Sequence, residues 1–220
     1  MMGPRDDKAL LSRLDRVLAS RVIAIVRTHS QEEILPLARA IAQGGIDVIE
    51  VALTSPGAIA AIGQIALEIQ GSIVGAGTVL DERQAEAAIE AGSQFLMSPG
   101  FSPRVLGAAS QRGIPYIPGA LTPTELLTIF EHGIRAVKIF PVASLGPSYI
   151  RDLLGPFPDL RAIPTGGVTR ENARAFLEAG AVAVGVGGAL TSHVPKGSYD
   201  IVAKRSAELR AHLGGGLDGR

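Results

Sequence analysis

A lysine lies in the middle of an apolar stretch, IRAVKIFPVA, at residues 134–143. β-Branched and aromatic residues dominate this stretch, which predicts a buried strand closed by Pro141. Lys138 must therefore either extend its stem to water or lose its charge. A neutral, buried amine is a nucleophile that can attack a carbonyl carbon, so Lys138 is the first candidate for chemistry.

A second candidate, Glu50, lies in another apolar segment, DVIEVAL. Side chains alternate along a strand, so Lys138 shares a face with Ala136 and Phe140, and Glu50 shares one with apolar residues. If both faces point inward, an amine and a carboxylate enter one pocket, as a Schiff-base enzyme requires. Taken alone, each residue also fits a snorkelling lysine or a rim carboxylate. Together, one strand length before a turn, they favour the catalytic interpretation.

A pattern of helix, glycine and short apolar strand recurs along the chain, and each of the two candidates lies in the strand of a different copy. Eight strands alternating with about eight helices in 220 residues favour one (β/α)8 TIM barrel over an open doubly wound sheet. An amphipathic segment before the first strand predicts an extra N-terminal helix. We expect a single domain over residues 1–220, with flexible tails at 1–7 and 214–220. The predicted strands cover residues 22–26, 47–53, 72–77, 94–98, 115–118, 136–140, 162–165 and 183–186.

Helix starts carry their own signals. Ser30 with Glu33, and Thr122 with Glu125, have the spacing of a capping box, in which two side chains satisfy backbone N–H groups at a helix start. The sequence therefore predicts that helices begin after Ser30 and after Thr122.

In this fold the active site lies at the C-terminal ends of the strands. Two glycine pairs, Gly166-Gly167 and Gly187-Gly188, follow adjacent strands, where barrels commonly bind phosphate through backbone N–H groups. The alternative is that each pair only makes a tight turn. Arg27 is either an anchor for a carboxylate or phosphate, or a solvated rim arginine. Thr165 directly precedes the first glycine pair and is a further candidate at a strand end.

Composition excludes several classes of function. Acidic and basic residues both number 21, so the net charge is zero, and no segment concentrates one sign. We therefore expect no nucleic-acid or membrane partner. The chain has no cysteine, and its four histidines lie far apart in sequence, which leaves little for a metal centre. No signal-peptide pattern precedes the first strand, so the expectation is a cytoplasmic protein without metal or cofactor.

Seven short motifs in order resemble the 2-keto-3-deoxy-6-phosphogluconate (KDPG) aldolase family, which also includes 4-hydroxy-2-oxoglutarate (KHG) and phosphogalactonate aldolases. The resemblance runs over residues 22–190 and implies a (β/α)8 barrel, a homotrimer and small-molecule substrates. The motifs are IEVALT, GAGTV, SPG, IPG with TPTEL, VKIFP, GPFP and PTGGV.

The resemblance also implies roles for single residues. Lys138 matches the Schiff-base lysine and Glu50 the proton-transferring glutamate. Arg27 falls where members carry a basic residue near the site. The resemblance and the positions at strand ends together give the remaining predicted substrate-binding residues: Thr54, Thr78, Pro99, Phe140, Thr165, Gly166, Gly167, Gly187 and Gly188.

The chain departs from the family pattern at two positions. Many bacterial members carry a substrate-contacting arginine where this chain has Thr54. Many also carry a phosphate-binding serine where this chain has Gly188. Both differences affect phosphate recognition more than the bond-breaking chemistry.

The expected function is therefore that of a class I aldolase that cleaves KDPG to pyruvate and glyceraldehyde 3-phosphate. A KHG or 2-keto-3-deoxy-6-phosphogalactonate aldolase is the alternative within the family. A metal-dependent phosphosugar epimerase would need inward-facing histidines and aspartates at strand ends, which this chain lacks. A non-catalytic phosphosugar-binding barrel would give Lys138 and Glu50 no reason to converge.

Overall fold

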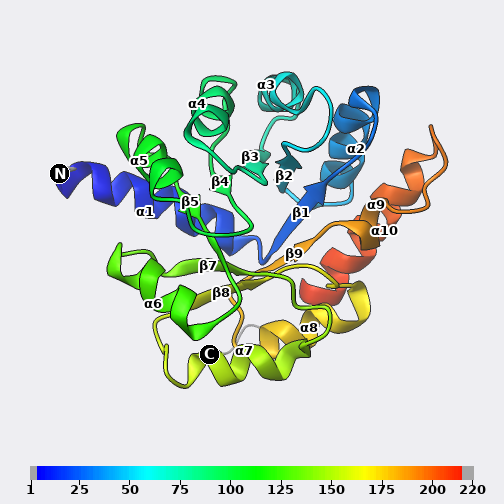
Figure 1. The fold of residues 1–220 in the computed structure, drawn as a ribbon. Coiled ribbons are helices and arrows are strands. Elements are labelled where there is room, and N and C mark those ends of the chain that lie inside the picture. Colours follow the sequence, from blue (N-terminus) through cyan, green and yellow to red (C-terminus); the bar gives the residue numbers. More distant parts are fainter. Residues whose placement is uncertain (1–3, 215–220) are drawn as a thin grey trace.

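The computed structural model describes the backbone of residues 4–214 and the side chains from Leu10 onward. Helices and strands alternate, and the helices surround the strands (Figure 1). The strands are β1 (Val22–Val26), β2 (Val48–Ala52), β3 (Ile73–Gly77), β4 (Leu96–Met97), β5 (Tyr116–Ile117), β6 (Gly119–Ala120), β7 (Ala136–Ile139), β8 (Arg161–Pro164) and β9 (Val184–Val186). The helices are α1 (Pro4–Ala19), α2 (Gln31–Gln43), α3 (Ala58–Glu68), α4 (Glu82–Glu90), α5 (Pro103–Gln111), α6 (Pro123–Glu131), α7 (Gly146–Leu154), α8 (Arg170–Glu178), α9 (Gly188–Thr191) and α10 (Tyr199–Gly214).

All strand pairs are parallel. Six strands form one sheet in the order β5-β4-β3-β2-β1-β9, and three form a second in the order β6-β7-β8. A bridge between Thr165 and Gly185 joins the ends of β8 and β9, and only Pro118 separates β5 from β6. The result is an α/β fold with a curled parallel sheet.

The expected eight strands become nine because the chain is divided at Pro118. Proline has no N–H to donate to a sheet ladder, so the strand predicted over residues 115–118 ends before it. Tyr116 and Ile117 pair with β4, whereas Gly119 and Ala120 pair with β7. The strands therefore belong to two hydrogen-bonded sheets, where the sequence predicted one continuous barrel.

Two apolar clusters are buried. The larger lies between the strands and the surrounding helices. The smaller lies inside the curled sheet, where Leu18 of α1 joins inward-facing strand residues such as Val48 and Ala136. The extra N-terminal helix thus packs against the inner side of the sheet. Side chains two residues apart on a strand share a face. Glu50 follows Val48 by two residues and Lys138 follows Ala136 by two, so both lie on this inner side, nearer the C-terminal ends of their strands.

The predicted flexible tails fall largely outside the described residues, namely at 1–3 and 215–220. Residues 4–7 belong to α1, which begins at Pro4, and Gly214 ends α10. Proline is well suited to the first position of a helix because that N–H would have no partner. Between residues 4 and 214, no helix is both long and apolar enough to cross a bilayer.

Candidate active site

The side chain of Lys138 meets that of Glu50 inside the curled sheet. Its Nζ lies 3.6 Å from Glu50 Oε1. Lys138 is 4% exposed and Glu50 is 0% exposed. The backbone of β7 is fixed at this point, since Lys138 N donates to the Pro118 carbonyl at 2.9 Å. The two groups that sequence reasoning paired are therefore adjacent and shielded from bulk water.

Glu50 can lie here because the neighbouring strand gives it space. A Cβ built on Gly77 of β3 would lie 1.7 Å from Glu50 Oε1, so any side chain at that position would displace the carboxylate. Within the described residues, neither carboxylate oxygen accepts a hydrogen bond. A buried carboxylate without such bonds is costly and rare, and such groups concentrate at functional sites.

A pocket of about 560 Å³ opens above this pair. Its walls come from the ends of β1, β3, β4, β7, β8 and β9 and from the loops that follow them, as expected for the C-terminal side of a parallel sheet. Glu50 is buried and reaches the pocket through Lys138. The predicted residues that line the pocket are Arg27, Thr78, Pro99, Lys138, Phe140, Thr165, Gly166, Gly167, Gly187 and Gly188.

Arg27 and Thr78 form one wall of the pocket. Arg27 Nη2 donates to Thr78 Oγ1 at 3.1 Å. Thr78 has a φ of 59°, which is unusual for a β-branched residue and costs on the order of 1–3 kcal/mol. Local strain of this kind persists where a side chain must be held in a defined direction. Here it brings the threonine hydroxyl against the arginine.

Glycines in the second wall allow close packing. Gly166 and Gly167 have φ values of 85° and 82°, in the left-handed region that glycine adopts without strain. A Cβ on Gly167 would lie 2.6 Å from the Ala143 side chain. A Cβ on Gly185 would lie 2.4 Å from Thr165 Oγ1. The missing side chains thus let Gly167 lie against Ala143 and let Gly185 lie against Thr165.

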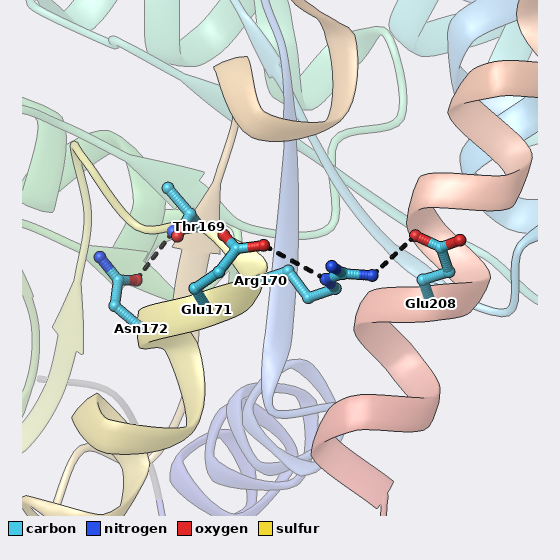
Figure 2. Close-up of polar contacts among 5 residues, drawn as sticks. All are labelled: Thr169, Arg170, Glu171, Asn172 and Glu208. Carbon is cyan, nitrogen blue, oxygen red and sulfur yellow. Dashed lines mark hydrogen bonds and ion pairs between the residues drawn. The ribbon is translucent and has the colours of Figure 1, made fainter.

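The start of α8 anchors this glycine loop. Asn172 Oδ1 accepts from the Thr169 N–H at 2.8 Å (Figure 2). Asn172 Nδ2 donates to the Gly167 carbonyl at 2.9 Å. Arg170 forms ion pairs with Glu171 and with Glu208 of α10, as Figure 2 shows. The Asn172 side chain of α8 therefore holds the glycine loop in place. The Arg170–Glu208 ion pair in turn joins α8 to α10.

One predicted residue lies outside the pocket. Thr54 is exposed in the turn after β2 and is not among the lining residues. Its short side chain cannot extend as far as an arginine at the same position. Within the lining, the cationic side chains are those of Arg27 and Lys138, and no carboxylate contributes to the described walls.

Seven lining residues are not among the predicted site residues. Ile25 could have been found, because it lies two residues after the inward-facing Ile23. Thr191 and Ser192 could not, because the short helix α9 was not predicted. The complete set is Ile25, Val168, Thr169, Gly185, Ala189, Thr191 and Ser192.

No metal or cofactor was expected from the sequence. Among the described side chains, those of residues 10–214, no group of three or more His, Asp or Glu side chains lies close enough to hold a metal ion. What the pocket offers is an amine, a buried carboxylate, one arginine, hydroxyls and backbone N–H groups.

Comparison with known proteins gives consistent results. The sequence model of the KDPG and KHG aldolase family matches residues 14–204. The KHG/KDPG aldolase of Escherichia coli K12 is 37% identical over 191 residues, covering 85% of this chain and 89% of that protein.

Two solved structures are similar in fold and sequence. One is a KDPG aldolase from Legionella pneumophila, with pyruvate captured as a covalent carbinolamine intermediate (TM-score 0.81, 30% identity, 88% of this chain and 96% of that chain). The other is a porous protein cage designed by fusing symmetric oligomeric domains (TM-score 0.81, 31% identity, 88% of this chain and 72% of that chain).

Proposed function

Since the chain belongs to the KDPG and KHG aldolase family, we propose that Lys138 is its Schiff-base amine and Glu50 its proton-transferring group. The protein is a class I aldolase, a carbon–carbon lyase that acts on small-molecule 2-keto acids. The observation that carries the residue assignment is the buried pair, with Nζ and Oε1 3.6 Å apart at the floor of a pocket.

Cleavage begins when the neutral Lys138 amine attacks C2, the keto carbon. The carbinolamine loses water to give an iminium, which takes up electrons from the neighbouring bond. Glu50, directly or through a water molecule, accepts the proton of the C4 hydroxyl. The C3–C4 bond then breaks, its electron pair forms the enamine of pyruvate, and the C4 fragment leaves as an aldehyde.

The enamine must then be protonated at C3, and Glu50 holds the proton needed for this step. Hydrolysis of the resulting iminium releases pyruvate and restores the amine. One carboxylate can serve as both base and acid because the two proton transfers occur in sequence. Burial of the pair keeps bulk water away from the enamine until the aldehyde has left.

We assign KDPG as the preferred substrate, which would give glyceraldehyde 3-phosphate as the aldehyde product. The open glycine walls and the absence of carboxylates from the described lining support a phosphate at that end of the pocket. KHG and 2-keto-3-deoxy-6-phosphogalactonate are the alternative substrates. Arg27, Thr78, Pro99 and Phe140 line the same pocket as the amine and would hold the pyruvyl half.

Three broader features remain part of the proposal. The bridge between Thr165 and Gly185, and the short step from β5 to β6, support a closed (β/α)8 barrel as a single domain. The family resemblance and the match to a cage built from symmetric oligomeric domains support a homotrimer. A cytoplasmic location is also part of the proposal.

The proposal is tested by measuring pyruvate release from KDPG with two variants. Lys138→Met keeps much of the side-chain length but removes the amine, and it should abolish cleavage. Lys204→Met, at an exposed position on α10, is the matched control and should cleave at the wild-type rate. Residual cleavage by Lys138→Met near the wild-type rate would contradict the assignment of the lysine.

A further inference from the structure

Ser192 lies in the pocket wall directly after α9, with an exposed side chain. Its neighbour Thr191 also lines the pocket, but the Thr191 hydroxyl donates to the Gly187 carbonyl at 3.5 Å and is used within the turn. The serine hydroxyl is therefore the one that this segment presents to a ligand.

The position of the Ser192 hydroxyl depends on a missing side chain at Gly188. A Cβ built on Gly188 would lie 3.0 Å from Ser192 Oγ, closer than most real Cβ contacts. Ser192 N donates to the Gly188 carbonyl at 2.8 Å, so the two residues are fixed on one turn. The Ser192 hydroxyl thus lies in the space that a side chain at position 188 would occupy.

An arginine from a different helix holds this turn in place. Arg205 of α10 donates from Nη1 to the Leu190 carbonyl at 3.1 Å and to the Ser192 carbonyl at 2.9 Å. The last carbonyls of a helix have no partner within the helix, so these two bonds satisfy groups that would otherwise face solvent. A hydroxyl whose backbone is already fixed loses less conformational freedom when it binds a ligand.

The surroundings of Ser192 suit an anionic group. It lies in the pocket walls with Gly166, Gly167 and Gly187, whose backbone can approach a ligand closely. Neighbouring carboxylates would repel an anion, and the described lining contains none. A hydroxyl in such a wall donates a directional hydrogen bond that selects for an acceptor at a fixed place.

We propose that Ser192 is a specificity-determining residue that donates its hydroxyl to the phosphate of the substrate, and that Arg205 is the positioning residue that aims it. The inference rests on the proposed function and adds the residues that distinguish phosphorylated from unphosphorylated 2-keto acids. Ser192 lies one helical turn after Gly188. Because Gly188 has no side chain, the Ser192 hydroxyl has room to reach the phosphate.

The test compares KDPG with KHG, which has the same keto acid unit but no phosphate. Ser192→Ala should raise the KM for KDPG about tenfold, the size expected for one hydrogen bond to a charged group, with kcat changed much less. The KM for KHG should change several times less. Arg205→Met should shift the same ratio in the same direction. Arg210→Met is the matched control, because Arg210 on the same helix donates to the distant Ser20 carbonyl.

A rescue variant separates binding from general damage. Gly188→Ser in the Ser192→Ala background restores a hydroxyl beside the same space and should recover most of the KM for KDPG. An unchanged KM in Ser192→Ala, or an equal rise for both substrates, would overturn the inference. A wild-type protein that cleaves only KHG would also overturn it while leaving the aldolase assignment intact. A wild-type protein that cleaves neither would remove the proposed function itself.

Discussion

At the scale of single residues, chemistry depends on a carboxylate and an amine that are buried beside each other. Glu50 is fully buried, and its Oε1 lies 3.6 Å from Lys138 Nζ. If Glu50 only balanced the charge of Lys138, replacing it would change the stability of the protein. If Glu50 transfers protons, replacing it would lower turnover. The two roles therefore predict different outcomes for the same substitution.

Glu50→Gln keeps the size of the side chain and removes the base. Positioned acid–base groups contribute about 10²–10⁴-fold, so kcat for cleavage should fall within that range. Exchange of the pyruvate methyl protons with solvent needs the same group and should fall in parallel. Wild-type rates of cleavage and exchange in this variant would show that the proton-transferring group lies elsewhere.

The sequence predicts this pair because side chains alternate between the two faces of a strand. The face on which Glu50 and Lys138 lie can therefore be inferred without knowing the conformation of any loop. Ten of the twelve predicted residues line the pocket, and Glu50 lies under it. Thr54 does not line it, since it lies two residues beyond β2, in a turn where the chain has already reached the surface. Ser192 was missed because its position depends on the space beside Gly188 and on a bond from Arg205. Neither relation is local in sequence.

At the scale of elements, β3 must leave room for the Glu50 carboxylate of the neighbouring strand β2. Gly77→Ala would place a Cβ 1.7 Å from the present position of Glu50 Oε1, so the carboxylate must move. We expect a loss of kcat comparable to that of Glu50→Gln, with a stability loss of about 1–3 kcal/mol from overpacking. Steady-state kinetics and urea unfolding measure the two effects.

Gly107→Ala is the matched control for that change. Gly107 lies in α5, and a Cβ there would meet no atom within 4 Å. The control should retain full activity and gain stability by up to about 1 kcal/mol, because alanine favours a helix more than glycine does. Full activity in Gly77→Ala would show that Glu50 tolerates displacement and is not held for catalysis.

The start of α6 makes a prediction about pH. Glu125 accepts from the Leu121 N–H at 2.8 Å, and this bond, with those from Thr122, lowers the pKa of the Glu125 carboxyl. A lowered pKa in the folded state stabilises the protein above the unfolded-state pKa, and this contribution is lost as the pH falls through the folded-state pKa. The stability difference between wild type and Glu125→Gln should therefore shrink as the solution becomes acidic.

Urea unfolding at a series of pH values measures this difference, with Glu178→Gln at the exposed end of α8 as a control for charge removal. A difference that grows toward low pH would contradict the capping role of the ionised carboxylate.

Elements were predicted well where local chemistry decides them. The Thr122–Glu125 capping box is present, because both partners lie within one turn. Ser30 starts α2 as predicted but makes no side-chain cap, since Glu33 accepts instead from the Thr28 hydroxyl at 2.8 Å. The strand β6 was missed because Gly119–Ala120 has no hydrophobic pattern and forms only by pairing with β7. A competing local hydrogen bond from Thr28 therefore decided the first case, and pairing with a strand further along the chain decided the second.

At the scale of the whole molecule, the fold supplies a pocket at the C-terminal ends of the strands, and an apolar cluster with α1 lies on the inner side of the sheet below it. The iminium serves as the electron sink of the proposed reaction, so no metal is needed to stabilise the enamine. Cleavage of KDPG should therefore continue at the wild-type rate after exhaustive dialysis against EDTA. A loss of activity that zinc or manganese restores would favour metal-dependent chemistry on the same fold.

The most direct test of the central claim is covalent trapping at Lys138. Incubation with pyruvate and borohydride should reduce the iminium to a stable secondary amine, and peptide mass spectrometry should locate one adduct on Lys138. The adduct should also form in Glu50→Gln, more slowly, because the amine remains while proton transfer is impaired. An adduct on a different lysine, or no adduct at all, would contradict the account.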